Sequence, residues 1–250
     1  MRADVNAEGG DLGRPLHTAA YSGNRDLVQL LLDNGANINV QGSEYGTALQ
    51  AASYRGYREI VQLLLDNGAD INAQGGRYGT ALQAASYKGY MQIVQLLLDN
   101  GADVKAQGGE YGTALQAAFY RGIEIGLNKD DIQIIQLLLD KGADVNAQGH
   151  EHGTALEIIL DKGIEIGFDE DDIQIIQLLL DKGANVYAQG GKFLDALQAL
   201  RDGGHQDIVE LLLGKVADDV ELVSTFRGTA THLPNQTSVW SDGEESALSD

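Results

Sequence analysis

Residues 78–85 read YGTALQAA, and the same eight letters occur at residues 45–52 and 111–118. A second phrase, QLLLD, follows each copy. The 33-residue segments 46–78 and 79–111 differ at only six positions. Self-similarity at a period of this length is typical of repeat architectures, in which each unit packs only on its neighbours. The chain is therefore predicted to be a linear array and not a domain with one central core.

Each repeat is predicted to contain two short helices and a projecting turn. Thr47, Thr80 and Thr113 stand where a helix N-cap is expected, because a hydroxyl can accept a hydrogen bond from a first-turn backbone NH group. Alanines give the first helix a small apolar face, and QLLLD gives the second helix a broad leucine stripe. Gly35 follows the last leucine of the first repeat, where a left-handed backbone conformation ends a helix. A Gln-Gly-Gly turn then forms a finger.

The repeats differ in length. Equivalent leucines lie 33 residues apart from Leu16 to Leu115 but 41 apart from Leu115 to Leu197. The eight extra residues fall between the two helices, where a longer loop is expected, since lengthening a loop costs only about 0.6 kcal/mol per doubling. Residues 3–10 match the end of a repeat, so the chain is expected to start inside one.

The predicted boundaries follow this spacing. They are 1–13 for the end of a truncated preceding repeat, 14–45, 46–78 and 79–111 for ordinary repeats, 112–152 and 153–193 for repeats with an insert, 194–217 for a degenerate capping repeat, and 218–250 for an acidic, disordered tail.

Composition excludes several classes of protein. There is no cysteine, so disulfides and thiolate chemistry are not available, and no apolar run suggests a secretory signal or a membrane span. A net charge of -20 disfavours nucleic acid and anionic membranes, favours a basic protein partner and opposes self-association. We expect an intracellular monomer, cytoplasmic or nuclear.

No motif indicates catalysis. The sequence contains no nucleophile elbow, phosphate-binding loop or dinucleotide fingerprint, and its five histidines lack metal-ligand spacing. The acidic residues 169–172 lack the order of a calcium loop. They are better explained as a helix N-cap and first turn, where negative charge complements the helix dipole. We therefore predict a non-enzymatic protein with no cofactor and no metal.

The repeated phrases and the 33-residue step resemble the ankyrin repeat over roughly residues 3–220. The resemblance implies an all-α solenoid of stacked helix-turn-helix units with projecting finger loops and a concave groove that binds proteins. Only His17 stands at the family's histidine position, which Gln50, Gln83, Gln116 and Glu157 occupy in the later repeats. This sequence pattern of the repeats resembles that of fungal ankyrin arrays found C-terminal to NACHT-type nucleotide-binding modules.

Two aligned columns of aromatic residues are the candidate partner-binding site. The finger column contains Tyr45, Tyr78, Tyr111 and His152, beside Arg77 and Glu110, and a second column late in the first helices includes Tyr54 and Tyr87. Tyrosine offers a large contact area at low entropy cost, so these columns suit a peptide-binding surface. The alternative is that each ring packs on its neighbour, and both interpretations can hold together.

The primary functional hypothesis is a module that binds a protein or extended peptide in the concave groove. The alternative is a C-terminal sensor or scaffold segment of a larger NACHT-type signalling protein. Near-identical repeats are also compatible with recent duplication, in which case the groove binds nothing tightly.

Overall fold

The computed structural model describes residues 4–9, 13–42, 44–149, 153–186 and 192–215. These residues form α-helices and turns, with two isolated bridges, between Gly75 and Gly79 and between Gly149 and Gly153, and no β-strand. The all-α repeat solenoid predicted from the sequence is therefore confirmed. His152 and the predicted tail, residues 218–250, lie outside the described residues.

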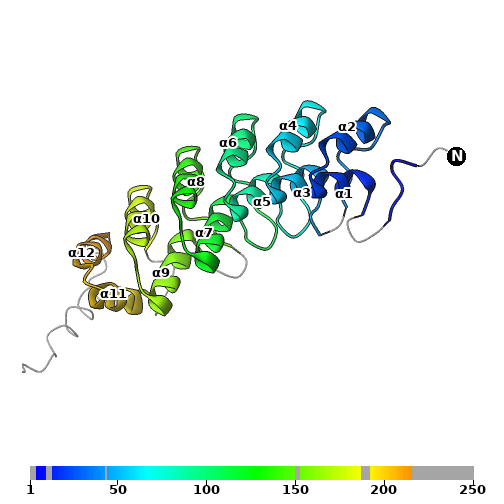
Figure 1. Ribbon diagram of the computed structural model, residues 1–250. Helices are drawn as coiled ribbons and strands as arrows, with labels where there is room; N and C mark the ends of the chain where they lie inside the picture. Colours follow the sequence, from blue (N-terminus) through cyan, green and yellow to red (C-terminus); the bar gives the residue numbers. More distant parts are fainter. Residues whose placement is uncertain (1–3, 10–12, 43, 150–152, 187–191, 216–250) are drawn as a thin grey trace, which may run out of the picture.

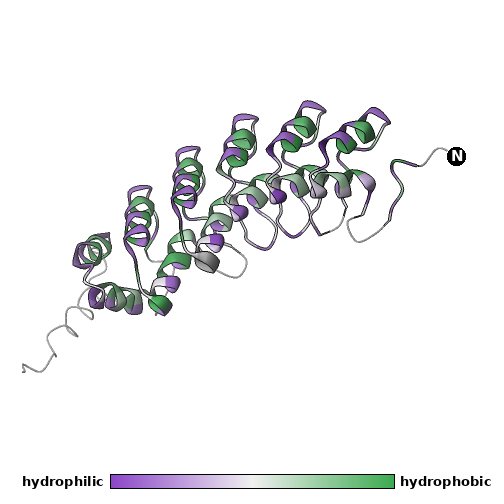
Figure 2. Ribbon diagram, viewed as in Figure 1, coloured by the Kyte–Doolittle hydropathy of each residue, from purple (hydrophilic) through white to green (hydrophobic). Residues whose placement is uncertain are grey.

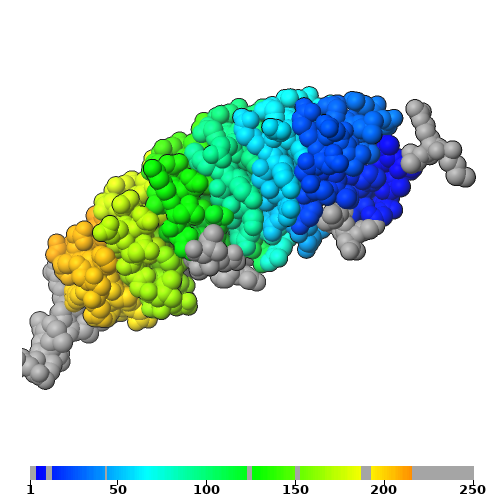
Figure 3. Space-filling model, viewed as in Figure 1, coloured from blue at the N-terminus to red at the C-terminus, as the bar shows by residue number. Residues whose placement is uncertain are grey.

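The helices come in pairs that stack in two rows along an elongated array (Figure 1). The first helices of the pairs are α1 (Pro15–Ser22), α3 (Ala48–Arg55), α5 (Ala81–Lys88), α7 (Ala114–Ile125), α9 (Ala155–Ile166) and α11 (Lys192–Asp202). The second helices are α2 (Arg25–Asp33), α4 (Arg58–Asp66), α6 (Met91–Asp99), α8 (Lys129–Asp140), α10 (Glu170–Asp181) and α12 (Gln206–Lys215). The pairs follow one another in chain order along the whole body (Figure 3).

The first helices begin where the threonines predict. The Thr47 side chain accepts a hydrogen bond from the Gln50 backbone NH, and the Gln50 side chain accepts one from the Thr47 backbone NH. The same capping box recurs at Thr80, Thr113 and Thr154. Each box satisfies two backbone donors that a helix start leaves open, and a cap of this kind contributes about 1 kcal/mol.

Alanines allow the first helices to approach one another closely. Ala20, Ala52 and Ala85 are completely buried, and they belong to helices α1, α3 and α5, which pack side by side. The second helices supply larger residues to the same core, such as Val61 and Leu64, which are also completely buried. Figure 2 shows the apolar stretches on the helices and the polar residues concentrated in the turns between them. The core is thus a continuous layer between the two rows.

The longer repeats differ from the sequence prediction. Helix α7 has 12 residues where α5 has 8, and α8 has 12 where α6 has 9. Seven of the eight extra residues therefore extend the two helices and one lengthens the connection between them, so they do not form the expected loop. Asn128 and Asp169 cap the lengthened second helices, as the cluster of first-turn acids predicts. A capped, periodic segment propagates the helix it adjoins, because each added residue gains one hydrogen bond after nucleation.

Asparagines join successive repeats along one edge. The side-chain oxygen of Asn39 accepts the backbone NH of Asp70 at 2.8 Å, and that of Asn72 accepts the backbone NH of Asp103 at 2.8 Å. Asn6 makes the same contact with Asn37, also at 2.8 Å. Asn6 therefore stands in the same relation to Asn37 as Asn39 does to Asp70.

Candidate functional site

The finger turns between helix pairs are held in register by their own backbones. The Arg77 NH donates to the Glu44 carbonyl at 2.6 Å, and the Glu110 NH donates to the Arg77 carbonyl at 2.8 Å. Gly76 lies so close to the preceding finger that a Cβ atom would be 2.5 Å from the Glu44 carbonyl oxygen and the Gly46 nitrogen. Its φ of 61° also favours glycine. The fingers thus form a closely packed row.

Glutamine side chains of the first helices hold this row of fingers in place by hydrogen bonds. Gln50 Nε2 donates to the Gly75 carbonyl at 3.0 Å and to the Ala73 carbonyl at 3.2 Å, and Gln83 Nε2 donates to the Gly108 carbonyl at 2.9 Å. Both glutamines are buried, so these bonds satisfy groups that would otherwise be costly to desolvate. His17 fills the same role in the first repeat, with Nε2 2.8 Å from the Val40 carbonyl.

Seven tyrosines form one interleaved stack, which we call the tyrosine ladder. Its rings alternate between helix ends and finger turns in the order Tyr21, Tyr45, Tyr54, Tyr78, Tyr87, Tyr111 and Tyr120. Successive ring centroids lie between 4.5 and 5.4 Å apart. This range is that of favourable aromatic pairs, each worth about 0.5–1.5 kcal/mol beyond its buried area. The two columns seen separately in the sequence are therefore one structure.

Burial differs along the ladder. Tyr78 and Tyr111 are only 7% and 9% exposed, whereas Tyr45, Tyr54 and Tyr87 are half-buried. Burial raises the pKa of Tyr78, and the hydrogen bond between the Tyr45 and Tyr21 hydroxyls, 3.3 Å apart, raises the pKa of Tyr45. The rings thus pack on their neighbours, and Tyr45, Tyr54 and Tyr87 remain partly exposed at the surface.

The charged residues of the fingers pair with each other. Arg77 forms a two-point ion pair with Glu110, with Nη2 3.0 Å from Oε1. The hydrogen bond from Arg77 lowers the pKa of Glu110 and fixes both side chains across neighbouring fingers. About half of the Arg77 side chain stays exposed. The alternating charges that the sequence suggested are thus partly neutralised within the array.

Two further cations line the ladder and were not among the predicted site residues. Arg55 lies over the ring of Tyr21, with its guanidinium carbon 4.7 Å from the centroid, and Lys88 lies over Tyr54, with Nζ at 5.0 Å. Both directly follow a ladder tyrosine at the end of a first helix. The sequence shows that both residues directly follow a ladder tyrosine. It does not show that their side chains contact tyrosines of the preceding repeat.

The acidic residues 169–172 serve the helix start. The Asp169 side chain accepts the Asp172 backbone NH at 2.9 Å, and Asp172 accepts Lys162 Nζ at 2.6 Å. Nowhere in the described ranges do three His, Asp or Glu side chains gather as a metal-binding set. The capping interpretation of this segment is confirmed.

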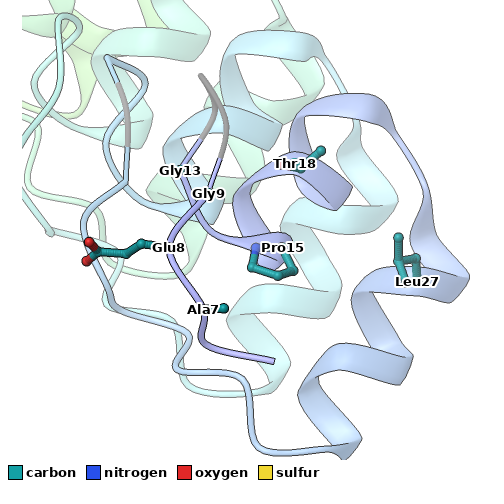
Figure 4. A pocket seen from close by; sticks show the side chains of 7 residues that line it. All are labelled: Ala7, Glu8, Gly9, Gly13, Pro15, Thr18 and Leu27. Carbon is teal, nitrogen blue, oxygen red and sulfur yellow. The ribbon is translucent and has the colours of Figure 1, made fainter. Parts of the chain in front are cut away.

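A shallow pocket of about 360 Å³ lies beside α1 and is lined by Ala7, Glu8, Gly9, Gly13, Pro15, Thr18 and Leu27. Most of the lining is small or apolar (Figure 4). Glu8 is the ionisable residue among the described lining residues, and that carboxylate points away from Pro15 and Leu27 to pair with Arg14. The described part of the lining therefore contains no pair of acid and base for proton transfer.

The described helices include none that is both long and apolar enough to traverse a lipid bilayer. No curated protein matches the sequence. The family model for ankyrin repeats, which spans three copies, matches residues 2–75 and again residues 74–149, together more than half of the chain. This match concerns ankyrin repeats in general and carries nothing about fungal arrays or NACHT-type modules. With its paired helices, finger turns and repeat period, the chain belongs to the ankyrin-repeat family.

Proposed function

We propose that this protein is a non-catalytic interaction module that binds a protein or an extended peptide along the tyrosine ladder, in the concave groove of the array. Ankyrin repeats generally mediate protein–protein interaction. The observation that carries the proposal is the ladder itself: a continuous row of aromatic rings, some of them half-buried, held on helices and hydrogen-bonded fingers. A preorganised surface of this kind loses little entropy when a partner binds.

The proposed contacts have distinct parts. The half-buried rings of Tyr45, Tyr54 and Tyr87 contact the partner, while Tyr78 and Tyr111 act mainly by holding those rings in place. The Arg77–Glu110 pair borders the site at the finger tips. His152 continues the finger column by sequence and stays a prediction. No observation favours the alternative of a sensor segment in a larger signalling protein.

The test is site-specific crosslinking in an extract of source cells. A photoreactive phenylalanine analogue replaces Tyr45, Tyr54 or Tyr87 in turn in the full chain, and captured proteins are identified by mass spectrometry. The matched control replaces Tyr90, which is also partly buried but lies outside the ladder at the N-cap of α6. We expect the same partner from all three ladder positions and not from the control. Equal capture from Tyr90 would refute a ladder-directed site.

A further inference from the structure

Arg55 and Lys88 are available cations beside the ladder. Arg55 ends α3 and is exposed, and Lys88 ends α5 and is half-buried. Each lies over the ring of a tyrosine in the preceding repeat. In the ranges that the structure describes, neither side chain forms an ion pair with a carboxylate. Their charges are therefore positioned by aromatic rings but not neutralised.

The neighbouring cations are engaged with partners. Arg121 stands at the same position of the next repeat, but its Nε donates to Asp131 at 2.8 Å. Arg77 is held by Glu110. Among the described finger acids, Glu44 adds one formal negative charge beside Tyr45, so Arg55, Arg77 and Lys88 outnumber Glu44 and Glu110 by one. The part of the ladder between Tyr21 and Tyr87 thus has an excess of positive charge in a protein with a net charge of -20.

Local charge decides what binds here. At physiological ionic strength, charges are screened over about 8 Å, so distant carboxylates of the array contribute little to a contact at Arg55 or Lys88. A cation over an aromatic ring is also partly desolvated, which strengthens its interaction with an incoming anion. The basic partner that net charge favours is therefore the wrong class for this part of the surface.

We propose that Arg55 and Lys88 bind two carboxylate side chains of an extended partner segment that lies across the tyrosine ladder. This inference rests on the proposed function and specifies the partner's chemistry. Neighbouring packed helices are roughly 8–10 Å apart, and an extended chain advances about 3.3 Å per residue. The two acidic residues are thus about three positions apart in the partner. Arg55, with its planar fork, accommodates a carboxylate in two-point contact.

The experiment selects ligands from a library of random peptides about 12 residues long, displayed against the full chain. Selected peptides are then synthesised, and their affinities are measured by fluorescence anisotropy. The test variant is Arg55→Glu with Lys88→Glu. The control variant is Arg25→Glu with Arg58→Glu, which changes the net charge equally at exposed arginines on α2 and α4.

The expected peptides carry Asp or Glu pairs about three residues apart. We expect at least about a tenfold loss of affinity with the test variant, and a loss of similar size when the peptide acids become Asn or Gln. The control variant is expected to bind within about twofold of the unaltered chain. Salt weakens binding to the unaltered chain more than binding to the test variant.

Other outcomes separate the two proposals. Peptides without acidic pairs that lose binding on Tyr54→Ala but not on the charge reversal overturn this inference and leave the proposed function standing. If no peptide is selected, or if neither Tyr54→Ala nor the charge reversal weakens the binding of the selected peptides, both proposals fail.

A synthetic peptide of residues 241–250, SDGEESALSD, is the further probe. If it binds at Arg55 and Lys88 as tightly as the selected peptides, the occupant is the chain's own acidic end, which overturns a partner in trans.

Discussion

One position early in the first helices α1, α3, α5, α7 and α9 bonds to the next finger, to the start of its own helix, or to both. His17, Gln50, Gln83, Gln116 and Glu157 occupy it in turn. The glutamines donate through Nε2 to finger carbonyls and accept a threonine NH through Oε1. An amide suits this position because it offers both a donor and an acceptor. Histidine and glutamate each satisfy only part of that requirement.

His17 should make the first repeat sensitive to acid. Burial lowers its pKa, so the folded protein favours the neutral imidazole. Its contribution to the free energy of unfolding is therefore complete above about pH 6.5 and is lost as the pH falls through the lowered folded-state value, by up to about 1.4 kcal/mol per pH unit. We expect His17→Gln to be close to neutral at pH 7.5 and more stable than the original protein at pH 5. Urea unfolding at both pH values measures this, and equal pH dependence of the two proteins would contradict it.

Glu157 occupies the same position as His17 in a later repeat, but its hydrogen bonding differs. Its Oε2 accepts the Thr154 NH at 2.7 Å, but Oε1 is buried with no hydrogen-bond partner among the described residues. Replacing Glu157 with Gln restores the side chain of the three preceding repeats and removes a poorly satisfied buried oxygen. We expect stabilisation of about 1–3 kcal/mol at pH 7, measured by urea unfolding. Glu165→Gln, at an exposed position on the same helix, is the control and should change stability by less than about 0.5 kcal/mol.

At the scale of the helices, the lengthened repeats contain ion pairs that the shorter repeats lack. Lys162 and Asp172 are 6% and 0% exposed, and Asp131 is also fully buried beside Arg121. Burial raises the pKa of Asp131 despite the opposing effect of Arg121. Each pair links the first helix of its repeat to the N-terminus of the second. The longer repeats therefore contain an ion pair that joins their two extended helices.

Removing one member of the enclosed pair should be costly. Lys162→Met leaves Asp172 buried without its counter-ion, and we expect a loss of about 3–5 kcal/mol in the free energy of unfolding. Lys141→Met removes an exposed pair with Asp99, 3.6 Å away, and should cost no more than about 1 kcal/mol. Urea unfolding of both variants at neutral pH provides the comparison. Similar losses of unfolding free energy in the two variants would show that burial of the Lys162–Asp172 pair does not increase its contribution to stability.

How much the sequence could predict depends on whether a feature lies within one repeat. The threonine caps and the cap at Asp169 are local, and they were predicted correctly. The insert was expected as a loop because leucine spacing counts residues without showing whether they continue a helix. The tyrosine ladder joins each finger to helices of two repeats, and the sequence alone did not give the offset between the columns. The contacts of Arg55 and Lys88 were missed for the same reason.

Across the whole molecule, the ladder should make the array unequally stable. Stability in a repeat array is approximately a sum of repeat and interface contributions. Among the described residues, the ladder spans the first four repeats with Tyr120 as its last ring, and Asp161 stands where its helix column would continue. The described residues of α9 and α11 form no aromatic pair with each other, so that interface lacks the contribution of about 0.5–1.5 kcal/mol per aromatic pair.

Hydrogen exchange of backbone amides tests this difference. Helices α3 and α4 form the second pair from one end of the described array, and α9 and α10 form the second pair from the other, so end effects are matched. We expect the amides of α9 and α10 to open at a free energy at least about 1 kcal/mol lower than those of α3 and α4. Tyr78→Leu should reduce protection in α3–α6 while changing α10 little, because it removes stacking without removing apolar bulk. Equal protection at the two ends, or an equal effect of Tyr78→Leu on both, would mean that the ladder does not set the stability of its repeats.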